Sequence, residues 1–440
     1  MCDCIDETVM DITTPRNAFL SAFYKRSFAY YTVKERLPKI LTQAVDLLAR
    51  NKDKVVEEYG LGAKEELKSV IGEISKLKYE LQTNKPMRNI MGTAPDADHY
   101  NLCIAKQSNI TYFTSVWLFA ECYMYRRIKE IFELTQHLQA YDLFRILKQE
   151  SFTNSYTAVV ELGKYLVTRF NETINENDIK DEFIKLLKLI LWGNKCDLSF
   201  SAGVVESSSD PFLLLTELES NIVKDQSEEI WLAVSDSNST SQFIDIVLDN
   251  AGYELFTDLC LADFLVTSKL AQKIRFYVKG MPWFVSDVTK FDFDWTIQEM
   301  KKSDVPELKT LGDRWSKHLK EKNWIVVDHK FFTMPIDYSY MPKEGSDLYK
   351  QLAEAKLVIF KGDLNYRKLF GEKNWEPSTP IDVGLQGFVP SKLAIVRTIK
   401  CQLVCGLDSG VAETIAQKSP DWEVTGMYGL IQFCDKIKTY

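Results

Sequence analysis

An acid and an amide, Asp249 and Asn250, directly follow an apolar run in this chain of 440 residues. The run covers 244–248 and is rich in β-branched side chains, which is typical of a strand buried on both faces of a parallel sheet. Open parallel sheets bind ligands in the crevice outside the carboxyl ends of their strands, so the pair predicts a metal or substrate site. Alternatively, the two side chains cap the helix that follows the turn at Gly252.

Three further apolar runs, each predicted to be a strand, lead into polar residues. These residues are Asp287 after 274–278, the segment 361–368 (KGDLNYRK) after 357–360, and Arg397 with Lys400 after 393–396. Two carboxylates and an amide are typical ligands of Mg²⁺ or Mn²⁺. Backbone amides at a helix start, together with lysine and arginine, are typical of a phosphate site. Each residue alone could be a helix cap or a solvated side chain, but together they predict a metal site beside an anion site.

Two predicted helices carry polar residues whose role the sequence leaves open. These are Asn194 and Asp197, after an apolar helix expected to end at Gly193, and Glu121, Tyr125 and Arg126 in the helix predicted for 116–134. The first pair could stop the helix or supply supporting groups to the site. The second set could face the site or belong to the core and surface.

The elements that must position these residues differ between the two halves of the chain. Apolar residues recur at helical spacing before the polar segment 235–242, so an all-helical domain is expected over 27–240. After that segment, short apolar runs alternate with helical patterns, which predicts an α/β fold: a doubly wound, Rossmann-like α/β/α domain over 241–440. The predicted strands are 244–248, 274–278, 324–327, 357–360 and 393–396. The first 26 residues are expected to be a poorly ordered extension.

Composition narrows the class of protein further. The net charge is −8 with no long basic run, which argues against a nucleic-acid partner. The N-terminus lacks the pattern of a secretory signal, and no apolar run reaches the ~18 residues that cross a bilayer, so a cytoplasmic, or also nuclear, location away from membranes is expected. Nine scattered cysteines indicate free thiols, and the four histidines lack zinc-site spacing, which favours an oxygen-ligated cation. The motifs GxxxxGK[ST], GxGxxG and GxSxG are absent, which argues against P-loop, dinucleotide and nucleophile-elbow sites.

Several segments, in this order along the chain, resemble the metal-dependent damage-control phosphatases. They are SFAYYTVKERLPKIL, ECYMYRRI, DEFIKLLKLILWGNKCDLS, IVLDNAGYELFTDL, PWFVSD, FKGDLNYRKL and YGLIQF. Residues 397–400 (RTIK) match the RTxK motif of the eukaryotic subfamily, whose members are also described as protein-glutamate O-methyltransferases (acidic residue methyltransferases). The resemblance implies a helical N-terminal region on a doubly wound α/β/α domain, in agreement with the periodicity of the sequence.

The resemblance also implies roles for individual residues. The catalytic set, which would ligate a divalent cation (Mn, Mg, Co or Ni), is Asp249, Asn250 and Asp287. The contacts to a phosphorylated substrate would be Asp249, Asn250, Asp363, Leu364, Asn365, Tyr366, Arg367 and Lys400. Contacts to S-adenosyl-L-methionine, for the methyltransferase activity, would be Glu254 and Asp287. Independently of the resemblance, the positions of Asn194, Asp197 and Arg397 in the sequence suggest that these residues support the site.

The favoured function is hydrolysis of small phosphomonoesters, with sugar phosphates such as fructose 1-phosphate and fructose 6-phosphate as the expected substrates. This hydrolysis can need up to ~10²¹-fold acceleration, which requires concentrated positive charge from the cation, Lys400 and Arg367. The alternative is methyl transfer from S-adenosyl-L-methionine to glutamate carboxylates of a protein substrate. The sequence favours it less, because the loop after the first strand, DNAGYE, has a single glycine and methyl transfer has little need of a metal site.

Overall fold

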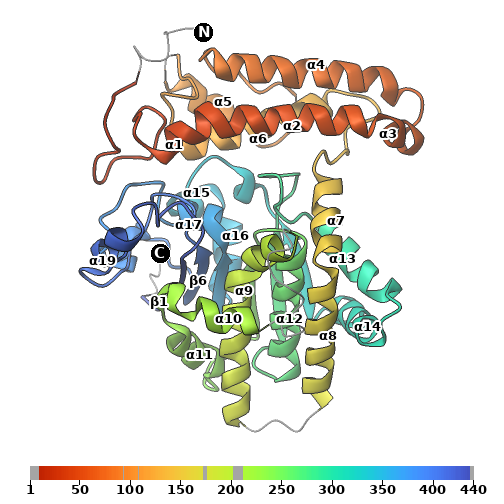
Figure 1. Ribbon diagram of the computed structural model, residues 1–440, viewed down its shortest axis with the longest axis vertical. Coiled ribbons are helices and arrows are strands. Elements are labelled where there is room, and N and C mark those ends of the chain that lie inside the picture. Colours follow the sequence, from red (N-terminus) through yellow and green to blue (C-terminus); the bar gives the residue numbers. More distant parts are fainter. Residues whose placement is uncertain (1–8, 93, 108, 172–175, 202–211, 437–440) are drawn as a thin grey trace.

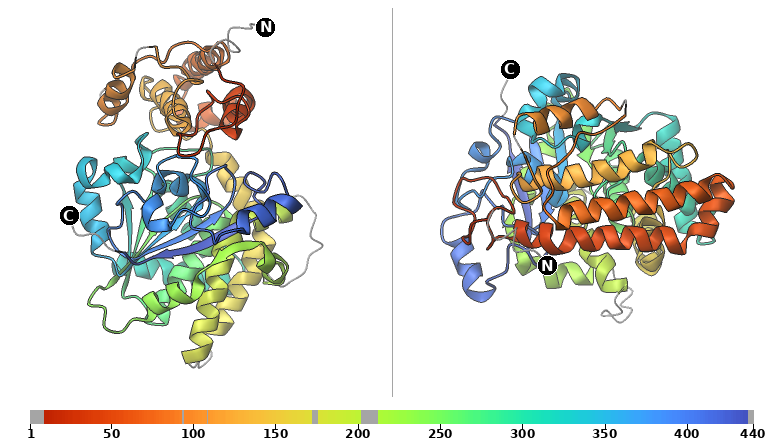
Figure 2. Two further views of the ribbon diagram at one scale, coloured as in Figure 1. Left: turned by 90° about the vertical axis from the view of Figure 1, so that its left-hand side faces the viewer. Right: turned by 90° about the horizontal axis from the view of Figure 1, so that it is seen from above.

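A group of N-terminal helices lies over one end of a sheet that is covered by helices on both faces (Figures 1 and 2). The computed structural model describes residues 9–92, 94–107, 109–171, 176–201 and 212–436. Across these residues, no helix combines the length and the apolarity that crossing a bilayer requires.

The sheet has seven strands in the order β1-β7-β6-β5-β2-β3-β4. Their bounds are β1 Ile222–Asp225, β2 Phe243–Val247, β3 Lys273–Val278, β4 Trp324–Asp328, β5 Leu357–Lys361, β6 Leu393–Thr398 and β7 Gly429–Cys434. Strands β2 to β6 run parallel, and β7 pairs antiparallel with β6 and parallel with β1. The chain builds outward in one direction through β2, β3 and β4 and in the other through β5 and β6, so the order reverses between β2 and β5. Ligands bind at such a reversal in doubly wound sheets.

The five strands that the sequence predicted are β2 to β6, and the predicted α/β class is confirmed. Two strands were not predicted. Strand β1 lies within the range expected to be all helical; it has four residues, none of them fully buried, so its sequence lacks an apolar run. Strand β7 is almost completely buried and lies between β1 and β6, antiparallel to β6, so it falls outside the strand–helix alternation that the sequence analysis followed.

Alternate residues of the central strands pack into two separate cores. In β5, Leu357 and Ile359 join one core, and Val358 and Phe360 join the other. This alternation gives each face of the sheet its own layer of helices, which explains the nearly continuous apolar runs of the strands. The buried exceptions in β2 and β3 are Asp245 and Arg275, which form an ion pair with each other.

One face is covered by α8 Tyr156–Asn171, α9 Glu176–Ser201, α11 Ser227–Ser235, α12 Tyr253–Thr267, α13 Lys290–Lys302 and α14 Pro306–Lys320, with the short α10 Leu213–Leu218 beside them. The other carries α15 Met341–Glu344, α16 Ser346–Ala353, α17 Gly362–Leu369, α18 Ile381–Gly384 and α19 Val411–Lys418. The helix end expected at Gly193 is wrong, because α9 continues to Ser201. A β-carbon at Gly193 would lie 3.2 Å from Cα of Glu254, so this glycine allows α9 to approach α12 closely.

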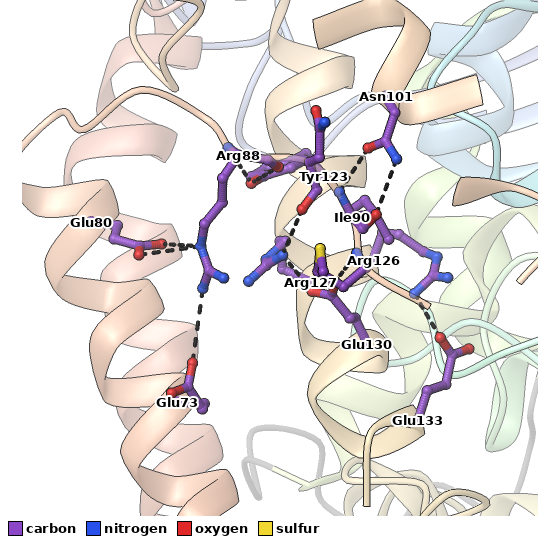
Figure 3. Close-up of polar contacts among 12 residues, drawn as sticks. Glu73, Glu80, Arg88, Ile90, Asn101, Tyr123, Arg126, Arg127, Glu130 and Glu133 are labelled. Carbon is purple, nitrogen blue, oxygen red and sulfur yellow. Dashed lines mark hydrogen bonds and ion pairs between the residues drawn. The ribbon is translucent and has the colours of Figure 1, made fainter. Parts of the chain in front are cut away.

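The N-terminal helices form a cap, defined here as residues 28–133. Its elements are α1 Phe28–Tyr31, a π-helical turn Thr32–Arg36, α2 Leu37–Arg50, α3 Lys52–Tyr59, α4 Ala63–Gln82, α5 Ala97–Ala105 and α6 Trp117–Glu133. Helix α7 Arg145–Asn154 leads from the cap into α8 (Figure 1). Figure 3 shows how ion pairs join the cap helices: Arg88 reaches Glu80 and Glu73 of α4, while Tyr123 of α6 donates its hydroxyl to the backbone of Arg88. Helix α6 is buried along nearly its whole length and is the central element of the cap.

The N-terminal segment was expected to be poorly ordered, but its described part, residues 9–26, is packed between the cap and the sheet domain. Leu20 and Ala22 are buried. The backbone of Leu20 accepts from the amide of Trp117 at 2.8 Å and donates to the carbonyl of Glu372 at 2.8 Å. The segment is fixed because its backbone groups find partners in both parts of the molecule.

Candidate active site

Asp249 and Asn250 lie just beyond the carboxyl end of β2, where the strand order reverses. The N-cap of α12 is Gly252, at φ +75°, and no side chain caps this helix. The capping alternative for Asp249 and Asn250 is therefore wrong. A β-carbon at Gly252 would lie 2.5 Å from Oγ of Ser151, so glycine is needed there both for the turn and for the close approach of α7.

The loop between β3 and α13 brings Asp287 to the same place. Asn250 and Asp287 form an isolated antiparallel bridge. The amide of Val288 donates to the carbonyl of Asp249 at 2.9 Å, and the amide of Ala251 donates to the carbonyl of Ser286 at 2.8 Å. Helix α13 has its own capping box, made by Thr289 and Asp292, so Asp287 is not its cap. The structure thus joins the three predicted ligands through their backbones.

The two carboxylates make this place strongly unfavourable for further negative charge. Burial raises the pKa of Asp249 well above its usual range, and the nearby Glu254 and Asp287 raise it further. Burial also raises the pKa of Asp287, although the ammonium of Lys279, 3.1 Å from Oδ2, opposes the shift. A bound cation would relieve this repulsion.

The donor set fits a hard divalent cation. Oδ2 of Asp287 is buried, and its contact with the Lys279 ammonium at 3.1 Å leaves it capacity for a further ligand. Asn250 adds a neutral oxygen, to which the hydroxyl of Ser286 donates. Within the described part of the chain no group of three His, Cys, Asp or Glu side chains could hold a metal. Mg²⁺ and Mn²⁺ bind oxygen ligands such as two carboxylates and an amide. They take water or substrate oxygens in their remaining coordination positions.

Glu254 is already engaged by protein groups. Its Oε2 accepts from Nδ2 of Asn250 at 2.9 Å, and its Oε1 lies 3.1 Å from Nζ of Lys361. The Lys361 ammonium also contacts Asp258 at 2.9 Å and the carbonyl of Ile190 at 2.8 Å. Because all of these side chains are buried, Glu254 and Lys361 fix the orientation of the Asn250 amide from behind.

The first turn of α17 lies directly against Asp249. A β-carbon at Gly362, at φ +86°, would lie 1.9 Å from Oδ2 of Asp249, so only glycine fits. The amino end of a helix attracts anions through its unpaired N–H groups and its dipole. The predicted metal ligands and the predicted anion site are therefore adjacent.

Asp363 connects α17 to the segment that follows β6. Its Oδ1 accepts from Nε of Arg397 at 2.8 Å and from the amide of Lys400 at 3.2 Å. Burial acts to raise the pKa of Asp363, but the positive charges of Arg397, Arg367 and Lys400 outweigh it and hold the pKa below its usual value. Lys400 also interacts electrostatically with Asp249. Asp363 thus fixes the backbone that carries Lys400 toward the site.

The other predicted substrate contacts on α17 have their polar atoms bonded within the protein. Arg367 pairs with Glu372 and with Glu121 of the cap, and its guanidinium lies 3.8 Å from the ring centroid of Trp117. Nδ2 of Asn365 donates to the carbonyl of Lys361 at 2.7 Å.

The remaining members of this set show the same pattern. Tyr366 contacts the carbonyl of Cys405 at 3.3 Å, and Leu364 is buried. Of the supporting residues, Arg397 is buried with its guanidinium 4.0 Å from the ring centroid of Tyr366. The side chains of Asn194 and Asp197 lie outside the described residues.

Lys279 was missed as a member of this site, and Lys361 was noted only as part of the polar segment 361–368, without a role of its own. Lys279 directly follows β3 and donates to the carbonyl of Leu248 at 3.1 Å, in addition to its contact with Asp287. Lys361 ends β5 and supports Glu254. Their signal in the sequence was a lysine at the end of an apolar strand, where a buried ammonium needs carboxylate partners.

Comparisons with known proteins show the family to which the chain belongs. The family model of the damage-control phosphatase ARMT1-like domain matches residues 32–415. Damage-control phosphatase ARMT1 from Mus musculus is 42% identical over 94% of this chain and 98% of its own length. The Homo sapiens protein of the same name is 41% identical over 92% of this chain and 96% of its own. The crystal structure of a DUF89 family protein from Pyrococcus horikoshii covers 89% of this chain and 97% of its own at 16% identity, with a TM-score of 0.42, a likeness too distant to bear on the site. On the two closer similarities, the chain belongs to the damage-control phosphatase ARMT1 family.

Proposed function

We propose that this chain hydrolyses small phosphomonoesters at a divalent cation held by Asp249, Asn250 and Asp287. Membership of the family makes the chain a phosphatase, which is a hydrolase. The observation that carries the metal site is the convergence of two buried carboxylates and an amide against the amino end of α17, at the reversal of strand order. A cation neutralises the carboxylates and the helix end receives an anion, and a phosphate ester needs both.

The chain's own residues divide the work of binding and charge stabilisation. When bound, the cation supplies Lewis acidity and positive charge at the phosphate oxygens. Lys400 and the first amides of α17 bind the remaining oxygens and stabilise the charge that develops on them. Asp363 holds the backbone of Lys400, and Glu254 with Lys361 holds the Asn250 amide, so that these groups need little reorganisation during the reaction.

We assign Arg367 a positioning role. Both carboxylates that it binds, Glu121 and Glu372, already neutralise its charge in a buried place. It therefore joins α17 to the cap and fixes the helix that carries Asp363. The positive charge on the substrate side is assigned to the cation, Lys400 and the helix end.

The substrates that we propose are sugar phosphates such as fructose 1-phosphate and fructose 6-phosphate, with Mn²⁺, Mg²⁺, Co²⁺ or Ni²⁺ as the cation. The test is a screen of the purified chain for phosphate release from a panel of sugar phosphates with each cation and with EDTA. We expect metal-dependent release that Asp249→Ala abolishes while the circular dichroism spectrum stays unchanged. Metal-independent release, or full turnover by Asp249→Ala, would overturn the metal site.

Methyl transfer from S-adenosyl-L-methionine to glutamate carboxylates of a protein has less support. Both oxygens of Glu254, its expected cofactor contact, are engaged by Asn250 and Lys361. The same preparation should therefore transfer no radiolabelled methyl group to a protein substrate. Transfer that Glu254→Gln removes, without loss of phosphatase activity, would establish a second activity.

A further inference from the structure

Two consecutive residues just before Asp287 adopt a backbone conformation that is unfavourable for their side chains. Phe284 has φ +44° and Val285 has φ +69°, and neither is glycine. Left-handed backbone is a genuine outlier for a β-branched residue such as valine. Such strain persists only where the surrounding structure holds it, and it gathers at functional sites.

The strained turn, residues 283–287, determines where Asp287 lies. The amide of Ser286 donates to the carbonyl of Phe284 at 2.9 Å, and the amide of Asp287 donates to that of Trp283 at 3.1 Å. Ser286 then binds Ala251 through its carbonyl and Asn250 through its hydroxyl. The left-handed residues reverse the chain so that Asp287 faces Asn250.

An aromatic side chain of the cap packs on this turn. The ring of Tyr125, on α6, stacks on that of Phe284 with centroids 4.7 Å apart and planes 27° apart. It also lies 6.0 Å from the ring of Trp283, which is 1% exposed. Tyr125 is itself buried, so a relaxed turn could not move toward the cap without displacing it.

We propose that Tyr125 and the strained turn form a clamp that holds Asp287 beside Asp249 for the cation. Two buried carboxylates repel each other, and a relaxed loop would let them separate. Packing of Phe284 on the cap keeps the turn in the strained form, so the cap positions a metal ligand to which it contributes no atom. Tyr125, Phe284 and Val285 are positioning residues, and the inference rests on the proposed function because the clamp serves the cation.

The competing explanation is that the turn is strained for packing alone. Both explanations predict that relief of the strain stabilises the metal-free protein. They differ in metal binding: a clamp loses affinity when its strain is relieved, whereas a packing detail does not. If the clamp exists, relief of the strain therefore raises the stability of the metal-free protein and lowers its affinity for the cation. If the strain serves packing alone, only the stability changes.

The test uses Val285→Asn, because asparagine is the non-glycine residue that best tolerates left-handed backbone. We expect the melting temperature of the metal-free full chain of 440 residues to rise by about 1–2 °C, because relief of ~1–2 kcal/mol of strain is small against the large unfolding entropy of such a chain. We expect the dissociation constant of Mn²⁺, measured by calorimetry, to increase about tenfold. The matched control is Val326→Asn in β4, also half-buried, where extended backbone suits valine and the melting temperature should fall.

A second pair of variants tests the cap. Tyr125→Leu removes the stacked ring and should weaken Mn²⁺ binding about tenfold, whereas Tyr125→Phe keeps the ring and should bind as the wild type does. Wild-type affinity in both Val285→Asn and Tyr125→Leu would overturn the clamp while leaving the metal site intact. A fall in the melting temperature of metal-free Val285→Asn would overturn the strain itself. A wild type that binds none of Mn²⁺, Mg²⁺, Co²⁺ and Ni²⁺ would instead overturn the proposed function.

Discussion

Gly362→Ala places one methyl group where the structure leaves no room for it. The new β-carbon would lie 1.9 Å from Oδ2 and 2.1 Å from Cγ of Asp249, whereas ordinary contact begins at 3.4 Å. The carboxylate must therefore retreat by about 1.5 Å, the difference between 3.4 and 1.9 Å. Metal–ligand distances tolerate only ~0.2 Å, so Asp249 would be lost as a ligand.

We expect Gly362→Ala to reduce kcat/KM by at least ~100-fold, because a misplacement of ~1 Å at a reacting group already costs that much. Mn²⁺ affinity should fall with it. The assay is metal-dependent phosphate release, with Mn²⁺ binding measured by calorimetry on the same preparation.

Alanine at Gly362 also strains the backbone, by ~1–2 kcal/mol at positive φ, and this contribution needs a control. Gly410 has φ +83°, close to the +86° of Gly362, and a β-carbon there meets nothing within 4 Å. Gly410→Ala should therefore show the same loss of stability with wild-type turnover and Mn²⁺ affinity. If Gly362→Ala behaves like Gly410→Ala, the close approach of α17 to Asp249 is not part of the site.

Three further predictions test other parts of the arrangement. Arg367→Met removes the cation that pairs with two buried carboxylates and should lower the free energy of unfolding in urea by about 3–5 kcal/mol. Arg16→Ala, at an exposed ion pair, should cost less than about 1 kcal/mol. Similar losses in both variants would contradict the assignment. Asp363→Ala should raise KM about tenfold while Mn²⁺ affinity stays unchanged, because Asp363 holds Lys400 and not the cation; a loss of Mn²⁺ affinity would place it among the ligands. Burial lowers the pKa of Lys368 from 10.5 to about 8. Between these two pH values the unfolded chain binds more protons than the folded chain. The contribution of Lys368 to the free energy of unfolding therefore rises with pH across this range. Lys368→Met should remove that rise in urea titrations from pH 7 to 10, and an unchanged pH profile would mean that the ammonium is not destabilised by burial.

The central strands were predictable because both faces of each are buried. Leu357, Val358, Ile359 and Phe360 form a continuous apolar run, since the alternate residues enter two different cores. The same rule failed for β1, whose four residues are half-buried or exposed. Gly193 was taken as a helix end because glycine weakens helices; its actual role, contact with α12, depends on a residue 61 positions away in the chain.

The convergence of the candidate site residues was predictable because the carboxyl ends of parallel strands share one edge of the sheet. Asp249, Asn250 and Asp287 meet there as expected. The orientation of single side chains was not predictable, because it depends on distant partners. The position of Arg367 after β5 suggests a phosphate ligand. In the structure, its guanidinium is bound by Glu121, which lies 246 residues earlier in the chain. The backbone strain at Val285 likewise leaves no trace in composition or periodicity.

The most direct test of the metal site is anomalous scattering from crystals of the full chain grown with Mn²⁺. We expect one strong manganese peak coordinated by Asp249, Asn250 and Asp287, at oxygen distances near those of six-coordinate hard cations, ~2.0–2.2 Å. The peak should disappear in Asp249→Ala crystals. A manganese peak elsewhere in an active protein, with no density between Asp249 and Asp287, would show that these residues do not hold the cation.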